Sequence, residues 1–253
     1  MTIQKPDTGH IPAIRHLWEV VFQDDADFLD RFFSLAFSPE RCVIALEGDD
    51  VAGMVHWLPC RCDGAPLAYL YAVATAPDFR NQGICRGLIT AAEEAIRAAG
   101  YQGILLVPQE EGLRTMYRSF GYDTATYLSE LVCAMGTEPA PMHPIPPQDY
   151  ALYRRELLPK GGVIQEEETL ALLAGEAQFY KGLGLLLAAR VLPDGNLLGL
   201  ELLGDPATAP GILCALGAPL GTFRIPGDRL PWAMYKKLTP DAPDVAHFAF
   251  ALD

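Results

Sequence analysis

The chain has 253 residues, of which 19 are basic and 32 acidic, so its formal net charge is −13. A chain this acidic lacks the basic surface that binds a phosphate backbone, which argues against a nucleic-acid partner. It has no apolar run of the ~20 residues needed to cross a bilayer and no basic-then-apolar leader, so we expect a cytoplasmic protein that does not bind membranes. Six cysteines without a CxxC pair and five scattered histidines lack the spacing of a metal site, and we expect no metal.

The first half of the chain alternates helical and strand-like segments. Apolar residues recur at helical spacing or in short runs bounded by turn residues. We predict helices over 8–22, 25–37, 85–99 and 111–120, and strands over 42–47, 51–61, 67–75, 103–107 and 122–134.

A proline-rich segment over 137–148 divides the chain, because it has five prolines and no periodicity. We therefore expect one domain over 1–136, a linker over 137–148 and a second domain over 149–253. In the second domain we predict helices over 149–158, 166–174, 206–216 and 229–238, a hairpin of 178–192 with 196–203, and strands over 220–225 and 245–252.

The two halves share short patterns. Val107-Pro108 is followed by Met116-Tyr117, and Ile225-Pro226 is followed at the same spacing by Met234-Tyr235. The second copy lacks about half of the segment that precedes the proline in the first. This likeness predicts a degenerate repeat, with chance similarity between two α+β segments as the alternative.

The stretch from Val73 to Leu88 connects a predicted strand to the start of a predicted helix. A helix N-terminus offers unpaired N–H groups to an anion. Gly83 permits a close backbone approach, and Arg80 and Arg86 can add charged contacts to phosphate. Taken singly, either arginine is equally well explained as a solvated surface charge.

In order, these residues resemble motif A of the GNAT acetyltransferases, with Pro77, an aromatic residue, Arg80 and Gly83 at the family's spacing. Cys85 stands where the family has Gly or Ala. The resemblance implies an α+β GNAT fold with a mixed, mostly antiparallel sheet, and acetyl-CoA as acyl donor. It also implies that the backbone of Val73, Ala74 and Thr75 pairs with the pantetheine arm. The CoA pyrophosphate would be bound by Arg80 and by Asn81, Gln82, Gly83, Ile84, Cys85, Arg86 and Gly87.

Tyr117 begins a second family pattern, a tyrosine followed after three residues by Gly121 and the aromatic Tyr122. In the family this tyrosine often protonates the departing CoA thiolate, and a phenol is chemically suited to that role. The alternative is that Tyr117 is an ordinary packing residue. Pro108 stands where many members have an asparagine.

The catalytic base is not evident, because the strand over 67–73 lacks the glutamate that many members carry there. Glu110, Glu111 and His56 are alternatives, although roles as solvated helix-start acids and as a structural histidine are more common for such residues. The layout resembles tandem GNAT proteins of the enhanced-intracellular-survival type, without their sterol-carrier-like domain. That resemblance implies a degenerate second GNAT-like half that shapes the acceptor pocket, and a terminal carboxylate, here on Asp253, as a possible base.

We therefore expect an acyl-CoA-dependent N-acetyltransferase that transfers acetyl directly to a primary amine in a ternary complex, with Tyr117 as general acid. The acidic composition favours a cationic acceptor such as a polyamine, an aminoglycoside or a lysine side chain. Because the second half has no copy of the 80–87 loop, we expect one CoA site per chain. The alternatives are a catalytically degenerate acyl-CoA sensor, and a partner-binding module without a CoA site.

Overall fold

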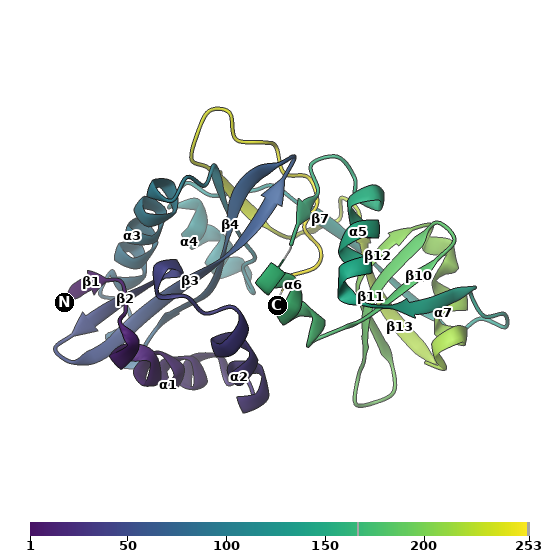
Figure 1. The fold of residues 1–253 in the computed structure, drawn as a ribbon, viewed down its shortest axis with the longest axis horizontal. Helices are drawn as coiled ribbons and strands as arrows, with labels where there is room; N and C mark the ends of the chain where they lie inside the picture. The colour runs from purple at the N-terminus through teal and green to yellow at the C-terminus, as the bar shows by residue number, and fades with distance from the viewer. Residues whose placement is uncertain (166, 252–253) are drawn as a thin grey trace.

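The structure, a computed structural model, describes residues 1–165 and 167–251 and consists of two lobes side by side (Figure 1). The elements before residue 125 are β1 (Thr2–Gln4), α1 (Ile11–Phe22), α2 (Ala26–Leu35), β2 (Cys42–Glu47), β3 (Asp50–Cys62), β4 (Ala65–Thr75), α3 (Ile84–Ala98), β5 (Gly103–Leu106), α4 (Glu111–Arg118) and β6 (Asp123–Thr124). They are followed by β7 (Tyr127–Ala134), β8 (Met142–Ile145), α5 (Pro147–Leu157), β9 (Val163–Ile164), α6 (Glu167–Ala174), β10 (Gln178–Gly182), β11 (Leu185–Val191), β12 (Leu197–Gly204), α7 (Ala209–Leu216), β13 (Leu220–Pro226), β14 (Leu230–Pro231) and β15 (Met234–Lys237).

The first lobe is a sheet between two helical layers. Its strand order is β1-β2-β3-β4-β5-β15-β6, with β9 beside β3. Neighbouring strands are antiparallel except β4 and β5, which are parallel. Alternate residues of β3 face opposite layers: Met54 packs with α1 and α2, whereas Val55 packs with α3 and α4. The predicted mixed, mostly antiparallel sheet is confirmed.

The second lobe repeats this design on a smaller scale. Its strand order is β14-β7-β13-β12-β11-β10-β8, and the pair β12–β13 is parallel, as β4–β5 is in the first lobe. Helix α7 packs on one face of this sheet, and α5 and α6 pack on the other. A smaller second half of similar design is therefore confirmed.

The lobes exchange a strand. Strand β7, from the first half of the chain, pairs with β13 in the second sheet, and β15 pairs with β5 and β6 in the first. Each borrowed strand lies beside the later member of the parallel pair, so the two occupy equivalent places. The boundary over 137–148 stays a prediction, and the sheets are interleaved across it.

Three predictions for the second half are wrong. The predicted helix over 229–238 is instead β14 and β15, because the 234–237 backbone bonds to β5 and overrides the local helical spacing. Residues 245–251 form no strand beyond one bridge between His247 and Gly162. The predicted strand over 178–192 turns back at residues 183–184, giving β10 and β11. Consequently Tyr235, on a strand, is not the counterpart of Tyr117, on a helix.

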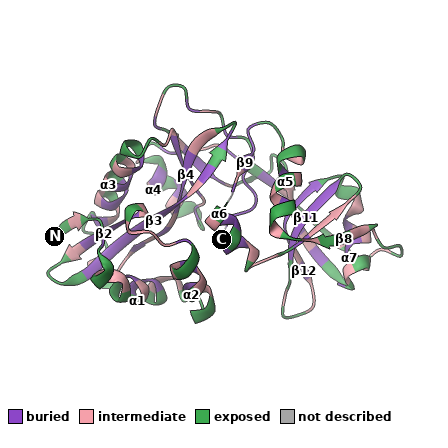
Figure 2. Cartoon of the chain, viewed as in Figure 1, coloured by how far each residue is buried: buried purple, intermediate pink, exposed green. Residues whose placement is uncertain are grey.

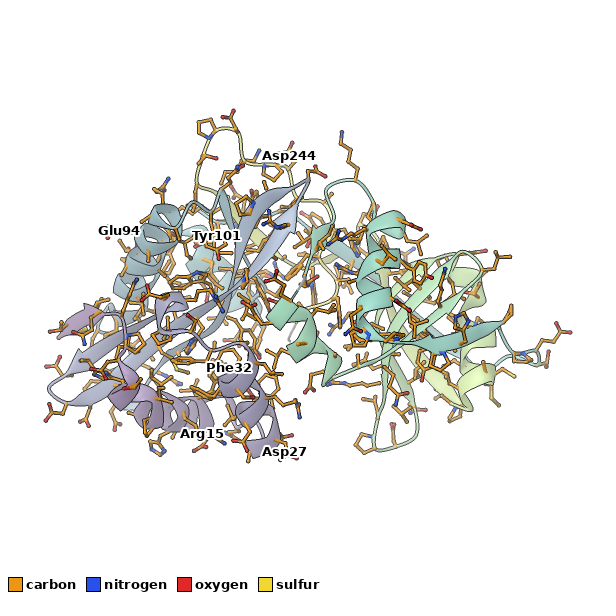
Figure 3. All side chains as sticks on the ribbon, viewed as in Figure 1. Arg15, Asp27, Phe32, Glu94, Tyr101 and Asp244 are labelled. Atoms are coloured by element: carbon orange, nitrogen blue, oxygen red, sulfur yellow. The ribbon has the colours of Figure 1, made fainter. Side chains whose placement is uncertain are left out.

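The cores of the two lobes meet around the end of the described chain. Buried residues line both sheets and the inner sides of their helices (Figure 2). Phe32 points from α2 into the first core, where it packs against Trp18 and His56 (Figure 3). Phe248 belongs to that first core and Phe250 to the second. Residues 245–251 therefore lie between the lobes as a buried segment.

Within residues 1–165 and 167–251, no helix combines the length and apolar character needed to cross a membrane. The same residues include no group of three or more His, Cys, Asp or Glu arranged to hold a metal ion.

Candidate active site

Strands β4 and β5 separate where the first sheet opens. They pair in parallel over three positions, from Leu67 with Gly103 to Tyr69 with Leu105. Beyond Tyr69, β4 is bulged: Ala72 has a φ of 50° and the register with β3 shifts by one residue. A bulge bends the strand that carries it. The C-terminal part of β4 consequently has an edge that β5 does not cover.

A cavity of about 250 Å³ occupies this opening. Its walls come from four segments: the end of β4, the residues that follow β5, helix α4, and helix α1 with the turn after it. The residues that line it are Tyr69 to Val73, Leu106 to Gln109, Leu113, Tyr117, Trp18, Val21, Phe22 and Asp24. The structure thus brings Tyr117 and Val73, two predicted site residues, to one cavity.

Tyr117 lies on α4 with only 6% of its surface exposed. Its ring meets those of Phe120 and Tyr122 edge-on, at centroid distances of 6.2 and 5.9 Å. Burial, reinforced by the nearby Cys85 thiol, raises the pKa of Tyr117 well above its usual value. The phenol therefore keeps its proton and can act as an acid but not as a base near neutral pH.

The loop between β4 and α3 has the backbone of an anion site. Asn81 and Gly83 both have positive φ, 62° and 80°. Gly83 is the N-cap of α3, and a Cβ added there would meet nothing within 4 Å, so the space before it is open. The first N–H of the helix to bond within it is that of Gly87, to the Gly83 carbonyl at 3.1 Å. The N–H groups of Ile84, Cys85 and Arg86 precede that bond and remain available to a ligand.

Two arginines flank this loop on the exposed side. Arg80 Nε donates to the Thr75 carbonyl at 3.3 Å, which fixes its stem at the end of β4. Arg86 stacks over the Phe120 ring at 4.5 Å and donates to the Ser119 hydroxyl at 3.4 Å. Both guanidinium groups are thereby held near the loop with further donors to offer, as a pyrophosphate requires.

The remaining predicted loop residues have different surroundings. Asn81 and Gln82 are exposed, whereas the Ile84 side chain is buried in the core. Gly87 packs closely against β1, because a Cβ at this position would lie 2.6 Å from Ile3 Cδ1. Ala74 and Thr75 pair with Met54 and Gly53 of β3 and do not line the cavity.

Three candidate bases, His56, Glu110 and Glu111, lie in the described chain, and none of them lines the cavity. His56 is buried among aromatic rings, with its Nε2 3.9 Å from Cys42 Sγ, and burial lowers its pKa to about 3. Glu110 caps α4 without a side-chain hydrogen bond, and Glu111 lies 3.7 Å from Arg114. Asp253 lies outside the described residues, so its role stays a prediction.

Asp24, which the sequence reasoning missed, is the one carboxylate among the described residues that line this cavity. Helix α1 ends at Gln23 in the left-handed conformation, and the chain then turns so that Asp24 accepts a hydrogen bond from Trp18 Nε1 at 2.8 Å. The only local signal was a turn between two predicted helices. Its proximity to Tyr117 depends on how α1 packs across the sheet.

A second cavity, of about 310 Å³, adjoins the first through Asp24 and Tyr71 and lies between the lobes. Asp25 and Phe28 line it from the first lobe. The second lobe contributes Leu173, Glu176, Arg190, Leu200 and Ala251. Glu176 is ion-paired with Arg31 and Arg190. No ion pair of Asp24 or Asp25 is found in the part of the chain that the structure describes.

The second lobe differs at the place of the anion loop. There the connection from β12 to α7 is a 3-10 turn over Pro206–Thr208, with Asp205 bonding back to Ala207 N. Asp205 thus caps this turn and places a negative charge just before α7, which disfavours an anion there. One loop of motif-A form is therefore present in the described chain.

Residues 2–125 match the family model described as an acetyltransferase (GNAT) domain. No protein of curated function matches the chain. Among solved structures, it is similar to a GCN5-related N-acetyltransferase from Kribbella flavida, with a TM-score of 0.72, 17% identity, and coverage of 94% of this chain and 71% of that one. It is also similar to Eis1 from Mycobacterium abscessus, with a TM-score of 0.67, 16% identity, and coverage of 90% and 67%.

A tandem GNAT protein from the clavulanic acid biosynthesis pathway matches with a TM-score of 0.59 and 15% identity, covering 95% of this chain and 100% of that one. These likenesses extend over both lobes and show a shared fold. The first half of the chain is a domain of the acetyltransferase (GNAT) family, and the whole chain has the tandem-GNAT fold.

Proposed function

We propose that the protein transfers an acetyl group from acetyl-CoA to a primary amine, directly, in a ternary complex. The observation that carries this is the cavity between β4 and β5, which Tyr117, the open edge of β4 and Asp24 line together. Such transfer needs a bound thioester, an aligned neutral amine and an acid near the sulfur. We also propose that residues 1–136 form the catalytic domain and that residues 149–253 shape the acceptor pocket.

Acetyl-CoA would bind with its pyrophosphate at the start of α3 and its pantetheine arm along β4. The free N–H groups of residues 84–86, the open space at Gly83, and the charges of Arg80 and Arg86 fit such a ligand. In the reaction the amine nitrogen attacks the thioester carbonyl and the carbon–sulfur bond breaks. The nitrogen would lose a proton, to Asp253 as base or to solvent, as it becomes an amide. Tyr117 would give its proton to the departing thiolate and recover one from solvent.

The acceptor would approach from the second cavity, where Asp24 and Asp25 have no ion-pair partner among the described residues and favour a cationic amine. Asp24 lies on the border of both cavities, where it can hold an ammonium group before transfer. Tyr71 and Phe28 add aromatic faces that attract alkylammonium ions. Asp253 as base stays part of the proposal; Ala251, two residues before it, lines this cavity.

The first test is titration calorimetry with acetyl-CoA on the wild type, Arg80→Ala and the control Arg229→Ala, which removes an exposed charge in the second lobe. We expect micromolar binding at one site per chain, weakened about tenfold or more by Arg80→Ala alone, as for loss of a charged phosphate contact. Release of free thiol with spermidine, an aminoglycoside or a lysine peptide would then establish transfer. Tight binding without transfer to any amine would favour the sensor, and no binding would exclude both.

A further inference from the structure

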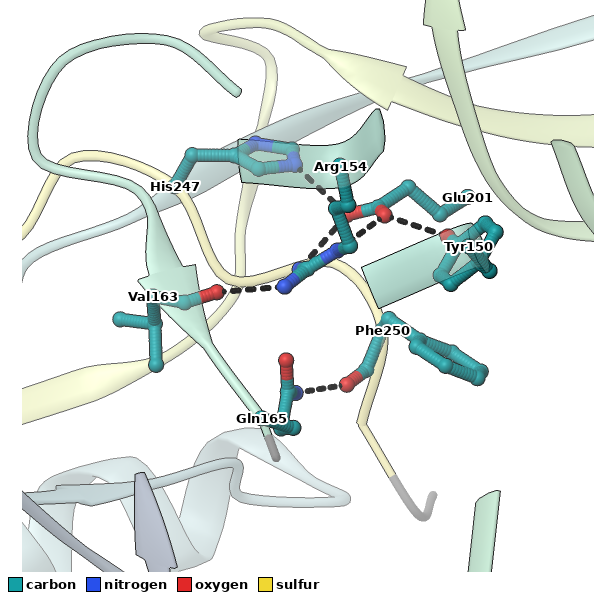
Figure 4. A network of polar contacts seen from close by, with 7 residues as sticks. All are labelled: Tyr150, Arg154, Val163, Gln165, Glu201, His247 and Phe250. Carbon is teal, nitrogen blue, oxygen red and sulfur yellow. Dashed lines mark hydrogen bonds and ion pairs between the residues drawn. The ribbon is translucent and has the colours of Figure 1, made fainter. Parts of the chain in front are cut away.

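A buried polar network in the second lobe holds the end of the chain (Figure 4). Glu201, on β12, has no exposed surface and forms a bidentate pair with Arg154 of α5, at 2.6 and 3.0 Å. Tyr150 donates to the same carboxylate at 2.7 Å, and Arg154 also donates to the Val163 carbonyl at 2.7 Å. His247 completes the network from residues 245–251, with its Nε2 donating to Glu201 Oε1 at 3.1 Å.

Residues 245–251, the C-terminal segment, lie between the two cores with few backbone bonds. Ala246 donates to Gly161 at 2.8 Å, and the His247 carbonyl accepts from Val163 at 2.8 Å. Gln165 donates to the Phe250 carbonyl. Because this segment forms no extended ladder in the described chain, side chains must determine its register.

Apolar side chains alone define that register poorly. Phe248 packs against Tyr69 in the first core, at 5.0 Å between ring centroids, and Phe250 packs against Tyr150 in the second, at 5.7 Å. The segment reads Phe-Ala-Phe-Ala over 248–251, so a shift by two residues would place one phenylalanine where the other had been. His247, by contrast, has one buried partner, Glu201. Buried polar groups are best attested in such register-defining roles.

The register of this segment matters to the second cavity, which Ala251 lines. Phe248 does not line the first cavity and reaches it through Tyr69, against which it packs. We propose that His247, held by Glu201, fixes the register of the C-terminal segment and thereby shapes the acceptor cavity. This positioning role rests on the proposed function.

The test variant is His247→Leu, matched by His247→Gln, whose amide can still donate to Glu201. Both Glu201 oxygens keep hydrogen bonds from Arg154 in either variant, so neither leaves a buried carboxylate unpaired. With spermidine as acceptor, we expect His247→Leu to raise the KM for the amine at least tenfold. The acetyl-CoA Kd should change less than twofold, and His247→Gln should restore the KM to within threefold of wild type.

A second readout requires no acceptor. The Val163 amide donates to the His247 carbonyl, so its hydrogen exchange should accelerate at least tenfold in His247→Leu and remain near wild type in His247→Gln. Gln165→Met, which removes the bond to the Phe250 carbonyl, should also accelerate exchange in the C-terminal segment.

Unchanged exchange at Val163 would overturn the proposal. So would faster exchange with an unchanged amine KM, or a parallel loss of amine and acetyl-CoA binding. If the wild type acetylates no amine, the proposed function fails, and the exchange measurement alone then decides whether His247 fixes the register.

Discussion

Trp18 Nε1 donates a hydrogen bond to the Asp24 carboxylate at 2.8 Å, which joins the indole to the turn after α1. Trp18 is buried and packs tilted against Phe32, at 4.5 Å between ring centroids. Asp24 is exposed and borders both cavities. A rigid core residue therefore orients the carboxylate that we place beside the acceptor amine.

Asp24→Asn keeps an oxygen for the Trp18 bond but removes the charge. A hydrogen bond to a charged partner contributes about 1.5–3 kcal/mol, so we expect the KM for spermidine to rise roughly 10- to 100-fold. Steady-state kinetics with saturating acetyl-CoA measure this. Asp27→Asn, which removes an exposed charge from the first turn of α2, is the matched control and should leave the KM unchanged. Equal values in the two variants would remove Asp24 from the acceptor site.

Tyr117→Phe tests the general acid. Proton transfer by a positioned side chain contributes about 10²- to 10⁴-fold, so we expect kcat to fall within that range. The acetyl-CoA Kd should stay within about twofold, since the ring is retained. Tyr101→Phe is the control, because Tyr101 is half-buried between α3 and β5 and does not line the cavity. An unchanged kcat in Tyr117→Phe would assign the proton to another donor.

The pH profile gives an independent test of the same residue. Because burial raises the pKa of Tyr117 above the ordinary value of about 10, the phenol keeps its proton throughout the neutral and mildly alkaline range. We therefore expect kcat measured from pH 7 to 9.5 to show no descending limb in the wild type. A fall in kcat centred below pH 9, absent from Tyr117→Phe, would contradict the shifted pKa.

The sequence was most informative where the chemistry is local. Gly83 was singled out because glycine permits a close backbone approach, and the structure places it at the N-cap of α3 with a positive φ. The strands and helices between residues 8 and 121 were predicted because their apolar periods agree with the pairing that the sheet adopts. Strand β1 was not predicted, and the single strand predicted over 122–134 is wrong, because β6 belongs to the first sheet and β7 to the second. Periodicity and turn residues are properties of neighbouring positions, so sequence alone carries them.

Relationships between distant segments were out of reach. Met234 and Tyr235 have helical spacing with their neighbours, but backbone bonding to β5 makes them a strand. The exchange of β7 and β15 and the place of Asp24 beside Tyr117 depend on the packing of both lobes. No local propensity encodes such contacts, which is why tertiary pairing overrides it.

Alanine substitutions at Gly83 and Gly112 test whether the positive φ of Gly83 requires glycine. Neither has an atom within 4 Å of an added Cβ, so a methyl group collides with nothing at either position. Gly83 has a φ of 80°, where an L-residue is strained by about 1–2 kcal/mol, so Gly83→Ala should lower the free energy of unfolding. Gly112 lies in helix α4, where alanine is favoured by about 0.5–1 kcal/mol. Urea titration should thus shift the two variants in opposite directions, and a shared direction would refute the account.

His56 should make stability depend on pH. It is 1% exposed, with Phe32 and Phe37 rings 5.4 and 5.8 Å away, and burial lowers its pKa to about 3. In the unfolded chain its pKa is about 6.5, so between these values the unfolded chain binds a proton that the folded chain does not. As far as His56 is concerned, the free energy of unfolding is highest above pH 6.5. It falls by up to about 1.4 kcal/mol per pH unit as the pH drops towards 3.

His56→Leu removes the titrating imidazole, so a comparison with the wild type isolates the contribution of His56 to the pH dependence of stability. Urea titrations of both proteins at pH 7.5, 6 and 4.5 give the difference in unfolding free energy, in which the other titrating groups largely cancel. From pH 7.5 to 4.5 we expect the wild type to lose about 2–3 kcal/mol more than the variant, as one proton's uptake over two units requires. Parallel pH curves would mean that His56 reaches water or titrates normally in the folded protein.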